Sequence, residues 1–134
     1  MGDTRAETPV TITRTSDDDG IAVVVVSGEI DMFCEHQVRA AIADQLERRP
    51  NGLVVDLAGV DFFGSAGIQL VVDAIVRAQR LGVALALATD RRTVLRPLEI
   101  TLVDQTVDIH PTLHDALTAL RAADVPTARR AANR

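Results

Sequence analysis

The sequence predicts a single α/β domain, a mixed and mostly parallel β-sheet with helices packed against it. Short apolar or β-branched runs, such as Ile21–Val26 and Leu53–Leu57, alternate with segments whose apolar residues follow helical spacing. The chain has 134 residues, of which 47% are hydrophobic, enough for one core and too apolar for an intrinsically disordered protein. The predicted order is β-β-α-β-α-β-α-β-α, with right-handed crossovers.

The predicted strands are short, and turn residues bound most of them. Alternation of apolar and polar residues predicts the first strand, and an acidic turn containing Gly20 joins it to a β-branched second strand as a hairpin. The later strands are apolar runs typical of a buried parallel sheet. The five predicted strands are Val10–Arg14, Ile21–Val26, Leu53–Leu57, Val83–Ala88 and Val107–Ile109.

Helical periodicity predicts the segments between these strands. The inner face of the first helix is expected to hold Val38, Ala41, Ile42 and Leu46, and that of the second Ile68, Val71, Val72 and Ile75. Gly82 suits the C-terminal cap of the second helix. Asp90 is a candidate cap for a short helix that Pro97 limits. The predicted helices span residues 34–48, 67–81, 91–95 and 112–122.

The chain ends are expected to lie outside the domain. Residues 1–8 are polar and predicted to be a flexible N-terminus, and the Ala- and Arg-rich residues 123–134 are predicted to be a disordered tail. The domain itself is predicted over residues 9–122.

Composition excludes several classes of function. A net charge of −5, no basic stripe and no Trp or Tyr argue against direct nucleic-acid binding. No apolar run reaches the ~20 residues of a membrane span, and the N-terminus lacks the apolar core of a signal peptide, so a cytoplasmic location is expected. Cys34 is the only cysteine, and no P-loop motif occurs. We therefore expect no cofactor and no metal site.

The most informative segment joins a buried strand to a helix through Phe62-Phe63-Gly64-Ser65-Ala66-Gly67. It places Ser65 where free backbone N–H groups and the helix dipole favour a phosphate. A simpler interpretation makes Ser65 an ordinary N-cap. A hydrolase nucleophile elbow is disfavoured because Phe63 stands at the first glycine of G-x-S-x-G.

Other residues with reactive side chains have structural interpretations. We expect His36, His110 and His114 to be solvated or capping residues, and Asp56, as the last residue of a strand, to bond the adjacent turn. Cys34 near a helix start is interpreted as a small residue, although the helix dipole could lower its pKa and make it a redox sensor.

Two motifs, in this order and spacing, resemble those of the STAS domain, and more specifically of bacterial anti-sigma-factor antagonists. The first is Gly28-Glu29-Ile30-Asp31 after the second strand. The second is Val54-Val55-Asp56-Leu57 followed by Phe62-Phe63-Gly64-Ser65-Ala66-Gly67-Ile68. The resemblance covers about residues 9–122. Gly64 stands where the family carries an aspartate before its serine.

The resemblance implies a partner-switching regulator of transcription rather than an enzyme. The unphosphorylated protein would bind an anti-sigma factor of the serine-kinase type, phosphorylation of Ser65 would release it, and a phosphoserine phosphatase would reset the switch. Asp31 would lie beside Ser65, and the protein would be a monomer or weak homodimer. The implied partner surface comprises Glu29, Asp31, Phe33, Cys34, Gly64, Ser65, Ala66, Gly67 and Gln69.

Two alternatives stay open within the same resemblance. One is a STAS accessory subunit that binds a transporter ATPase and needs no phosphorylation. The other is a nucleotide-binding STAS sensor.

Overall fold

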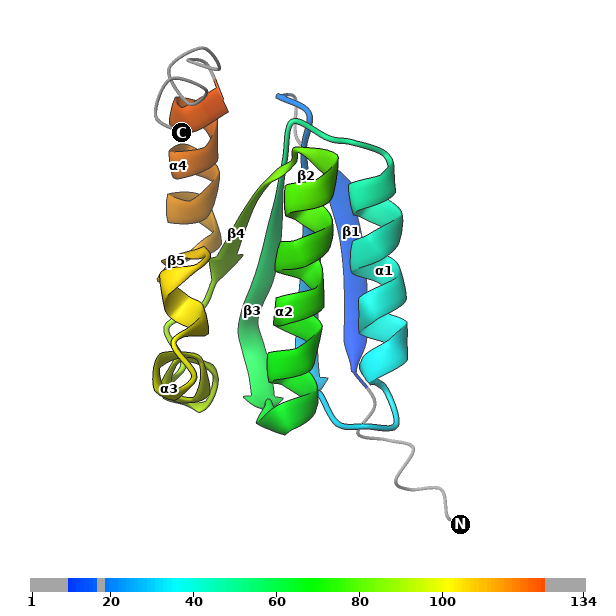
Figure 1. The fold of residues 1–134 in the computed structure, drawn as a ribbon, viewed down its shortest axis with the longest axis vertical. Helices are drawn as coiled ribbons and strands as arrows, with labels where there is room; N and C mark the ends of the chain where they lie inside the picture. The colour runs from blue at the N-terminus through cyan, green and yellow to red at the C-terminus, as the bar shows by residue number, and fades with distance from the viewer. Residues whose placement is uncertain (1–9, 17–18, 125–134) are drawn as a thin grey trace.

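The computed structural model describes residues 10–16 and 19–124, which form one five-stranded sheet in the order β1-β2-β3-β4-β5. The predicted fold class and order of elements are confirmed (Figure 1). The strands are β1 (Thr11–Ser16), β2 (Ile21–Glu29), β3 (Gly52–Phe62), β4 (Ala84–Ala88) and β5 (Asp108–His110). The helices are α1 (Glu35–Glu47), α2 (Gly64–Leu81), α3 (Arg92–Ile100) and α4 (Leu113–Asp124), with a 3-10 turn η2 (Val103–Gln105).

β1 pairs antiparallel with β2, and the other neighbouring strands pair in parallel. One buried cluster combines apolar side chains of the sheet with those of α1, α2 and α3. A second, smaller cluster places Ala116 and Leu120 of α4 against Val54 and Ala86 of the sheet. The sheet is therefore covered on both faces, with α1 and α2 side by side on one of them (Figure 1).

The helix faces agree largely with the sequence pattern. Val38, Ala41, Ile42 and Leu46 of α1 are all buried. In α2 the buried stripe includes Val71 and Ile75, whereas Ile68 and Val72 are only half-buried. The stripe is completed by Gly67, Leu70, Ala74 and Ala78. Gly82 caps α2 as predicted, with a left-handed φ of 72°.

β3 is longer than predicted, so Asp56 is not the last residue of its strand. The strand continues to Phe62, and its pairing with β2 shifts register between Val25 and Ser27. The carboxylate of Asp56 accepts a hydrogen bond from the N–H of Ala58 at 3.0 Å. Asp56 thus has the expected structural role, but at an irregularity within the strand rather than at its end.

The predicted end of α3 was wrong, because Pro97 lies inside the helix. Arg91 rather than Asp90 is the N-cap, and the helix runs on to Ile100. A proline in a helix interior costs about 3 kcal/mol, since it removes one backbone hydrogen bond and crowds the preceding turn. Val94 and Leu98, one turn apart, are both fully buried, and each contributes about 1.5–3 kcal/mol of packing that offsets this cost.

The predicted flexible N-terminus, residues 1–8, lies outside the described residues, as do residues 125–134 of the predicted tail. No helix in the described part of the chain is long and apolar enough to cross a membrane.

Candidate functional site

The two sequence motifs meet at one end of the sheet. β2 and β3 are parallel, so both strands end at the same edge, where Glu29 pairs with Phe62. The N–H of Ile30 donates to the carbonyl oxygen of Phe62 at 2.8 Å. The β2–α1 loop and the β3–α2 junction therefore lie side by side at the lower end of Figure 1.

Asp31 shapes the β2–α1 loop. Its carboxylate oxygen Oδ1 accepts hydrogen bonds from the N–H groups of Phe33 at 2.9 Å and Cys34 at 3.2 Å. The backbone carbonyl of Asp31 accepts from the N–H of Glu35 at 2.9 Å. These contacts leave the side chain of Phe33 pointing out of the loop, with 79% of its surface exposed.

Cys34 is the N-cap residue of α1 and is buried. Its thiol donates to the carbonyl oxygen of Glu29 at 3.1 Å. Burial raises the pKa of the Cys34 thiol above its ordinary value. The helix dipole could lower this pKa, but desolvation of the buried thiol is the largest effect and acts in the opposite direction, which gives the redox-sensor interpretation no support.

Ser65 lies in the first turn of α2 and is exposed. The N-cap is Phe63, and it makes no side-chain capping bond, so the interpretation of Ser65 as the N-cap is wrong. The helix begins earlier because the chain already turns at Gly64, which has a left-handed φ of 58°. The Ser65 hydroxyl makes no hydrogen bond within residues 10–16 and 19–124.

The two glycines beside Ser65 serve the packing of two phenylalanines. A Cβ at Gly64 would lie 3.2 Å from the ring of Phe62, in a backbone conformation that already disfavours side chains. A Cβ at Gly67 would lie 2.4 Å from Cδ1 of Phe63, whose side chain is 1% exposed. Position 64, where the family carries an aspartate, therefore holds a glycine that leaves room for the ring of Phe62.

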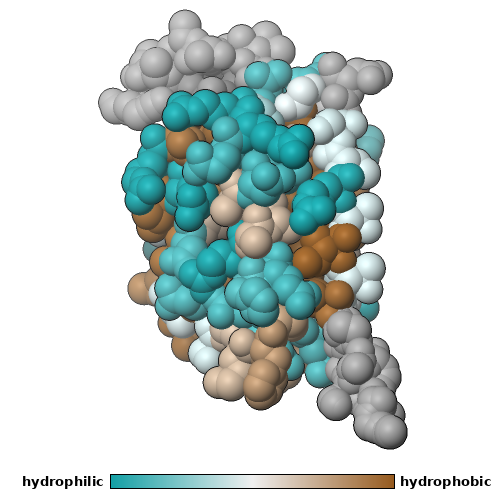
Figure 2. All heavy atoms as spheres, turned by 90° about the vertical axis from the view of Figure 1, so that its right-hand side faces the viewer, coloured by the Kyte–Doolittle hydropathy of each residue, from teal (hydrophilic) through white to brown (hydrophobic). Residues whose placement is uncertain are grey.

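Three exposed apolar side chains emerge at this end of the sheet, and we call them the apolar patch: Met32, Phe33 and Phe62, which are 73%, 79% and 51% exposed. Figure 2 shows light-brown atoms at the lower end of the α1 side. Of these three residues, the sequence placed only Phe33 on the implied partner surface. Met32 and Phe62 were missed because an apolar residue beside a strand end is expected to be buried.

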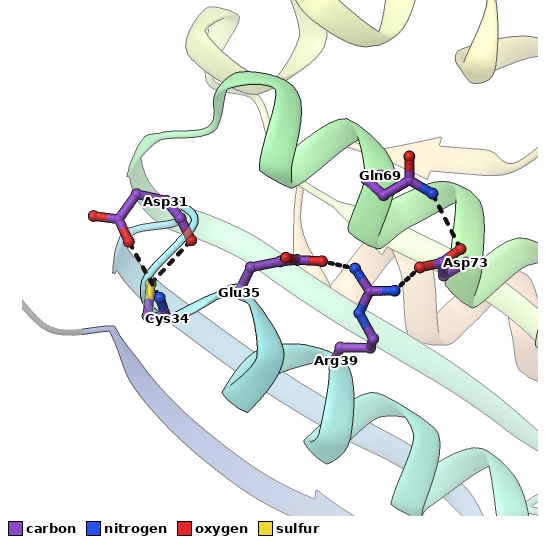
Figure 3. A network of polar contacts seen from close by, with 6 residues as sticks. All are labelled: Asp31, Cys34, Glu35, Arg39, Gln69 and Asp73. Carbon is purple, nitrogen blue, oxygen red and sulfur yellow. Dashed lines mark hydrogen bonds and ion pairs between the residues drawn. The ribbon is translucent and has the colours of Figure 1, made fainter.

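Gln69 belongs to a polar network that ties α1 to α2 (Figure 3). Its amide donates to Asp73 at 3.3 Å. The guanidinium of Arg39 lies between the carboxylates of Glu35 and Asp73 and pairs with both. The link between the two helices, from Arg39 to Asp73, therefore lies about one turn into α1 and about two and a half turns into α2.

The three histidines lie on or near the surface. His36 and His114 are exposed and His110 is half-buried. Within the described part of the chain, no three His, Cys, Asp or Glu side chains group closely enough to hold a metal ion. The structure thus places Glu29 at the end of β2, with Asp31 and Phe33 in the loop after it, at the same sheet edge as Gly64, Ser65, Ala66 and Gly67 in the first turn of α2.

Comparisons with known proteins identify the family. The family model of the STAS domain matches residues 13–116. The anti-sigma-F factor antagonist RsfB of Mycobacterium tuberculosis is 32% identical over 120 residues, which are 87% of this chain and 96% of the relative. The crystal structure of an anti-sigma factor antagonist from Mycobacterium paratuberculosis is 34% identical, with a TM-score of 0.78 over 85% of this chain and 96% of that chain.

A more distant structure supports the fold alone. Unphosphorylated SpoIIAA, an anti-sigma factor antagonist, superimposes with a TM-score of 0.69 at 17% identity, over 84% of this chain and 97% of that chain. Together with the matched motifs at the ends of β2 and β3, these similarities establish that the chain belongs to the STAS domain family.

Proposed function

We propose that this protein is an anti-sigma-factor antagonist that binds an anti-sigma factor when Ser65 is unphosphorylated and releases it when Ser65 is phosphorylated. The observation that carries the proposal is the exposed Ser65 hydroxyl, which makes no hydrogen bond to residues 10–16 or 19–124, at an end of the sheet that also exposes the apolar patch. Relatives with 30% or more identity over most of the chain are anti-sigma-F factor antagonists. The proposal describes a regulatory binding protein rather than an enzyme.

The apolar patch and the acidic loop residues give the surface two kinds of contact. Met32, Phe33 and Phe62 would enter apolar pockets of the partner, since exposed large apolar side chains are typical anchors of protein interfaces. Glu29 and Asp31 would meet basic groups at the rim of the contact, where charges guide association.

Phosphorylation would oppose this contact locally. A phosphate on Ser65 carries about −1.5 to −2 charges at neutral pH. The start of α2 tolerates that charge, because the free N–H groups of the first turn and the helix dipole face it. The partner surface would have to desolvate the phosphate, and a loss of a few kcal/mol weakens binding by two to three decades. A phosphoserine phosphatase would restore the binding form.

The experiment measures the intact mass of the protein after incubation with ATP and candidate kinase-type anti-sigma factors. We expect one added phosphate in the wild type and none in Ser65→Ala. Ser16→Ala is the matched control, because Ser16 is also exposed but lies at the end of β1, which pairs with the start of β2. Calorimetry should show that the unmodified protein binds the anti-sigma factor and that Ser65→Glu binds at least about a hundredfold more weakly.

Two results would contradict the proposal. If wild type and Ser65→Ala gain the same phosphate, the acceptor lies elsewhere. If no anti-sigma factor binds the unmodified protein while a transporter ATPase does, the accessory-subunit alternative replaces it.

A further inference from the structure

The outer face of α3 exposes a second set of apolar side chains that the Ser65 site does not use. Ile100 is 68% exposed and Leu102, just beyond the helix, is 59% exposed. The inner face of the same helix is fully buried through Val94 and Leu98. The exposed side chains on the outer face therefore do not contribute to holding α3 against the domain.

A hollow of about 460 Å³ runs along this outer face. Its lining comes from two rows of side chains spaced four residues apart along the helix: Arg92, Arg96 and Ile100, and Thr93, Pro97 and Thr101. Rows with this spacing form the ridges and grooves into which another helix packs. The shape of the surface therefore fits a helix better than an extended strand.

The charge of this face is positive, although the whole chain carries −5. Arg92 and Arg96 are exposed and form no ion pair with the rest of the described chain. By contrast, Arg91 pairs with Asp61 at 2.8 Å. The carboxylates of Glu99 and Asp104 line a different hollow, between α3 and β5. The complement of the outer face is therefore acidic.

Leu102 adds an independent observation. Its φ of 64° places a leucine in the left-handed region, which is unfavourable for an L-residue because Cβ approaches the following carbonyl oxygen. Backbone hydrogen bonds to Glu99 and from Gln105, both 3.1 Å long, stabilise the turn. The side chain itself gains little from the fold, because most of it faces solvent. Covering it would recover apolar burial that the isolated domain lacks.

We propose that the outer face of α3, formed by Arg92, Arg96, Pro97, Ile100 and Leu102, binds an acidic amphipathic helix of a partner protein. Apolar side chains of that helix cover Ile100 and Leu102, and its carboxylates pair with the two arginines in the bidentate geometry that guanidinium groups favour. The start of this face lies next to the β3–α2 junction, since the Thr93 hydroxyl donates to the carbonyl oxygen of Asp61 at 3.4 Å, but its residues differ from those proposed to bind the anti-sigma factor.

Other occupants fit the face less well. Recognition of an anionic membrane usually takes a cluster of about four to eight basic residues, and this face has two. A second copy of the chain would have to supply an acidic helix with a large exposed apolar stripe. Outside α3 and Leu102, Val76 is the only large apolar residue exposed on a described helix.

The test uses the full-length protein and two synthetic helical peptides. Both carry leucines on one face, and the polar flanks are glutamates in one and lysines in the other. Titration is followed by backbone amide NMR shifts. We expect saturable binding of the glutamate peptide that weakens with added salt, shifts confined to residues 92–102, and no binding of the lysine peptide.

The double variant Arg92→Glu/Arg96→Glu should lose at least about tenfold in affinity, since both charge contacts become repulsive. Its matched control is Arg48→Glu, an exposed arginine near the end of α1. Ile100→Ala should weaken binding, whereas Val76→Ala on α2 should not. Circular dichroism confirms that each variant is folded.

Several results would overturn the proposal: equal binding of both peptides, unchanged affinity in the double variant, or shifts centred on the apolar patch. If the protein sediments with phosphatidylserine vesicles, the face binds a membrane instead. If the protein self-associates with rising concentration and Arg92→Glu/Arg96→Glu does not, the face binds a second copy of the chain. Ser65→Glu should leave peptide binding unchanged, so this test is independent of the Ser65 switch.

Discussion

The contact between Gly67 and Phe63 offers the sharpest test of how the Ser65 turn is built. In Gly67→Ala, the added Cβ would lie 2.4 Å from Cδ1 of Phe63 and 2.6 Å from Cε1 and Cγ. These separations are far shorter than ordinary van der Waals contacts between carbon atoms. Phe63 is 1% exposed, so its ring cannot swing into solvent. Either the ring or the first turn of α2 has to move.

Two opposing effects set how much Gly67→Ala changes the free energy of unfolding. Alanine is favoured over glycine in a helix by up to about 1 kcal/mol. Overpacking of a core position typically costs about 1–3 kcal/mol, and the contact with three ring atoms places this substitution at the upper end. We expect the free energy of unfolding to fall by about 1–2 kcal/mol, which lowers the urea midpoint by roughly 0.5–1 M.

Equilibrium urea unfolding of the wild type, Gly67→Ala, Phe63→Leu and the double variant measures this effect. Leucine lacks the ring atoms that meet the new methyl group, so Gly67→Ala should cost less in the Phe63→Leu background than alone. Gly82→Ala is the matched control, because no atom lies within 4 Å of its added Cβ. It should show no coupling to Phe63→Leu. The reasoning is refuted if Gly67→Ala is as stable as the wild type, or if its cost is the same in both backgrounds.

Two further substitutions test the rest of the site. Gly64→Asp should lower the free energy of unfolding by about 1 kcal/mol or less. Asp tolerates a left-handed φ better than most residues, and Phe62, which is 51% exposed, can move away from the new side chain. A larger loss of stability, measured by thermal unfolding, would contradict this reasoning. The native Cys34 thiol should react with a disulfide reagent near pH 8 much more slowly than in urea, because burial disfavours the thiolate. The pKa of the Cys34 thiol in the folded protein lies above its ordinary value of 9.0. The thiol therefore stabilises the fold below about pH 9, and this contribution is lost as pH rises through the folded pKa. The free energy of unfolding of Cys34→Ala should lack this decline at alkaline pH. Two results would argue against a buried thiol: rapid reaction of Cys34 with the reagent in the folded protein, or the same loss of stability at alkaline pH in Cys34→Ala as in the wild type.

The fold was predictable because its pattern is local and repeated. Buried parallel strands appear as short apolar runs, and helices appear as apolar residues at spacings of three and four. The Gly82 cap was predictable for the same reason, since a left-handed helix end strongly favours glycine. The continuation of α3 past Pro97 was not, because the penalty of Pro97 is local whereas the burial of Val94 and Leu98 depends on distant segments.

The residue pattern alone was enough to predict an α/β domain, two motifs that follow parallel strands, and a position for Ser65 near a helix start. Parallel strands end at one edge, so the motifs had to meet. It took the tertiary structure to show that Ser65 is not the N-cap of α2, that Cys34 is buried, and that Met32 and Phe62 are exposed. Exposure is set by what packs against a side chain from distant segments, and a local sequence pattern carries little of that information.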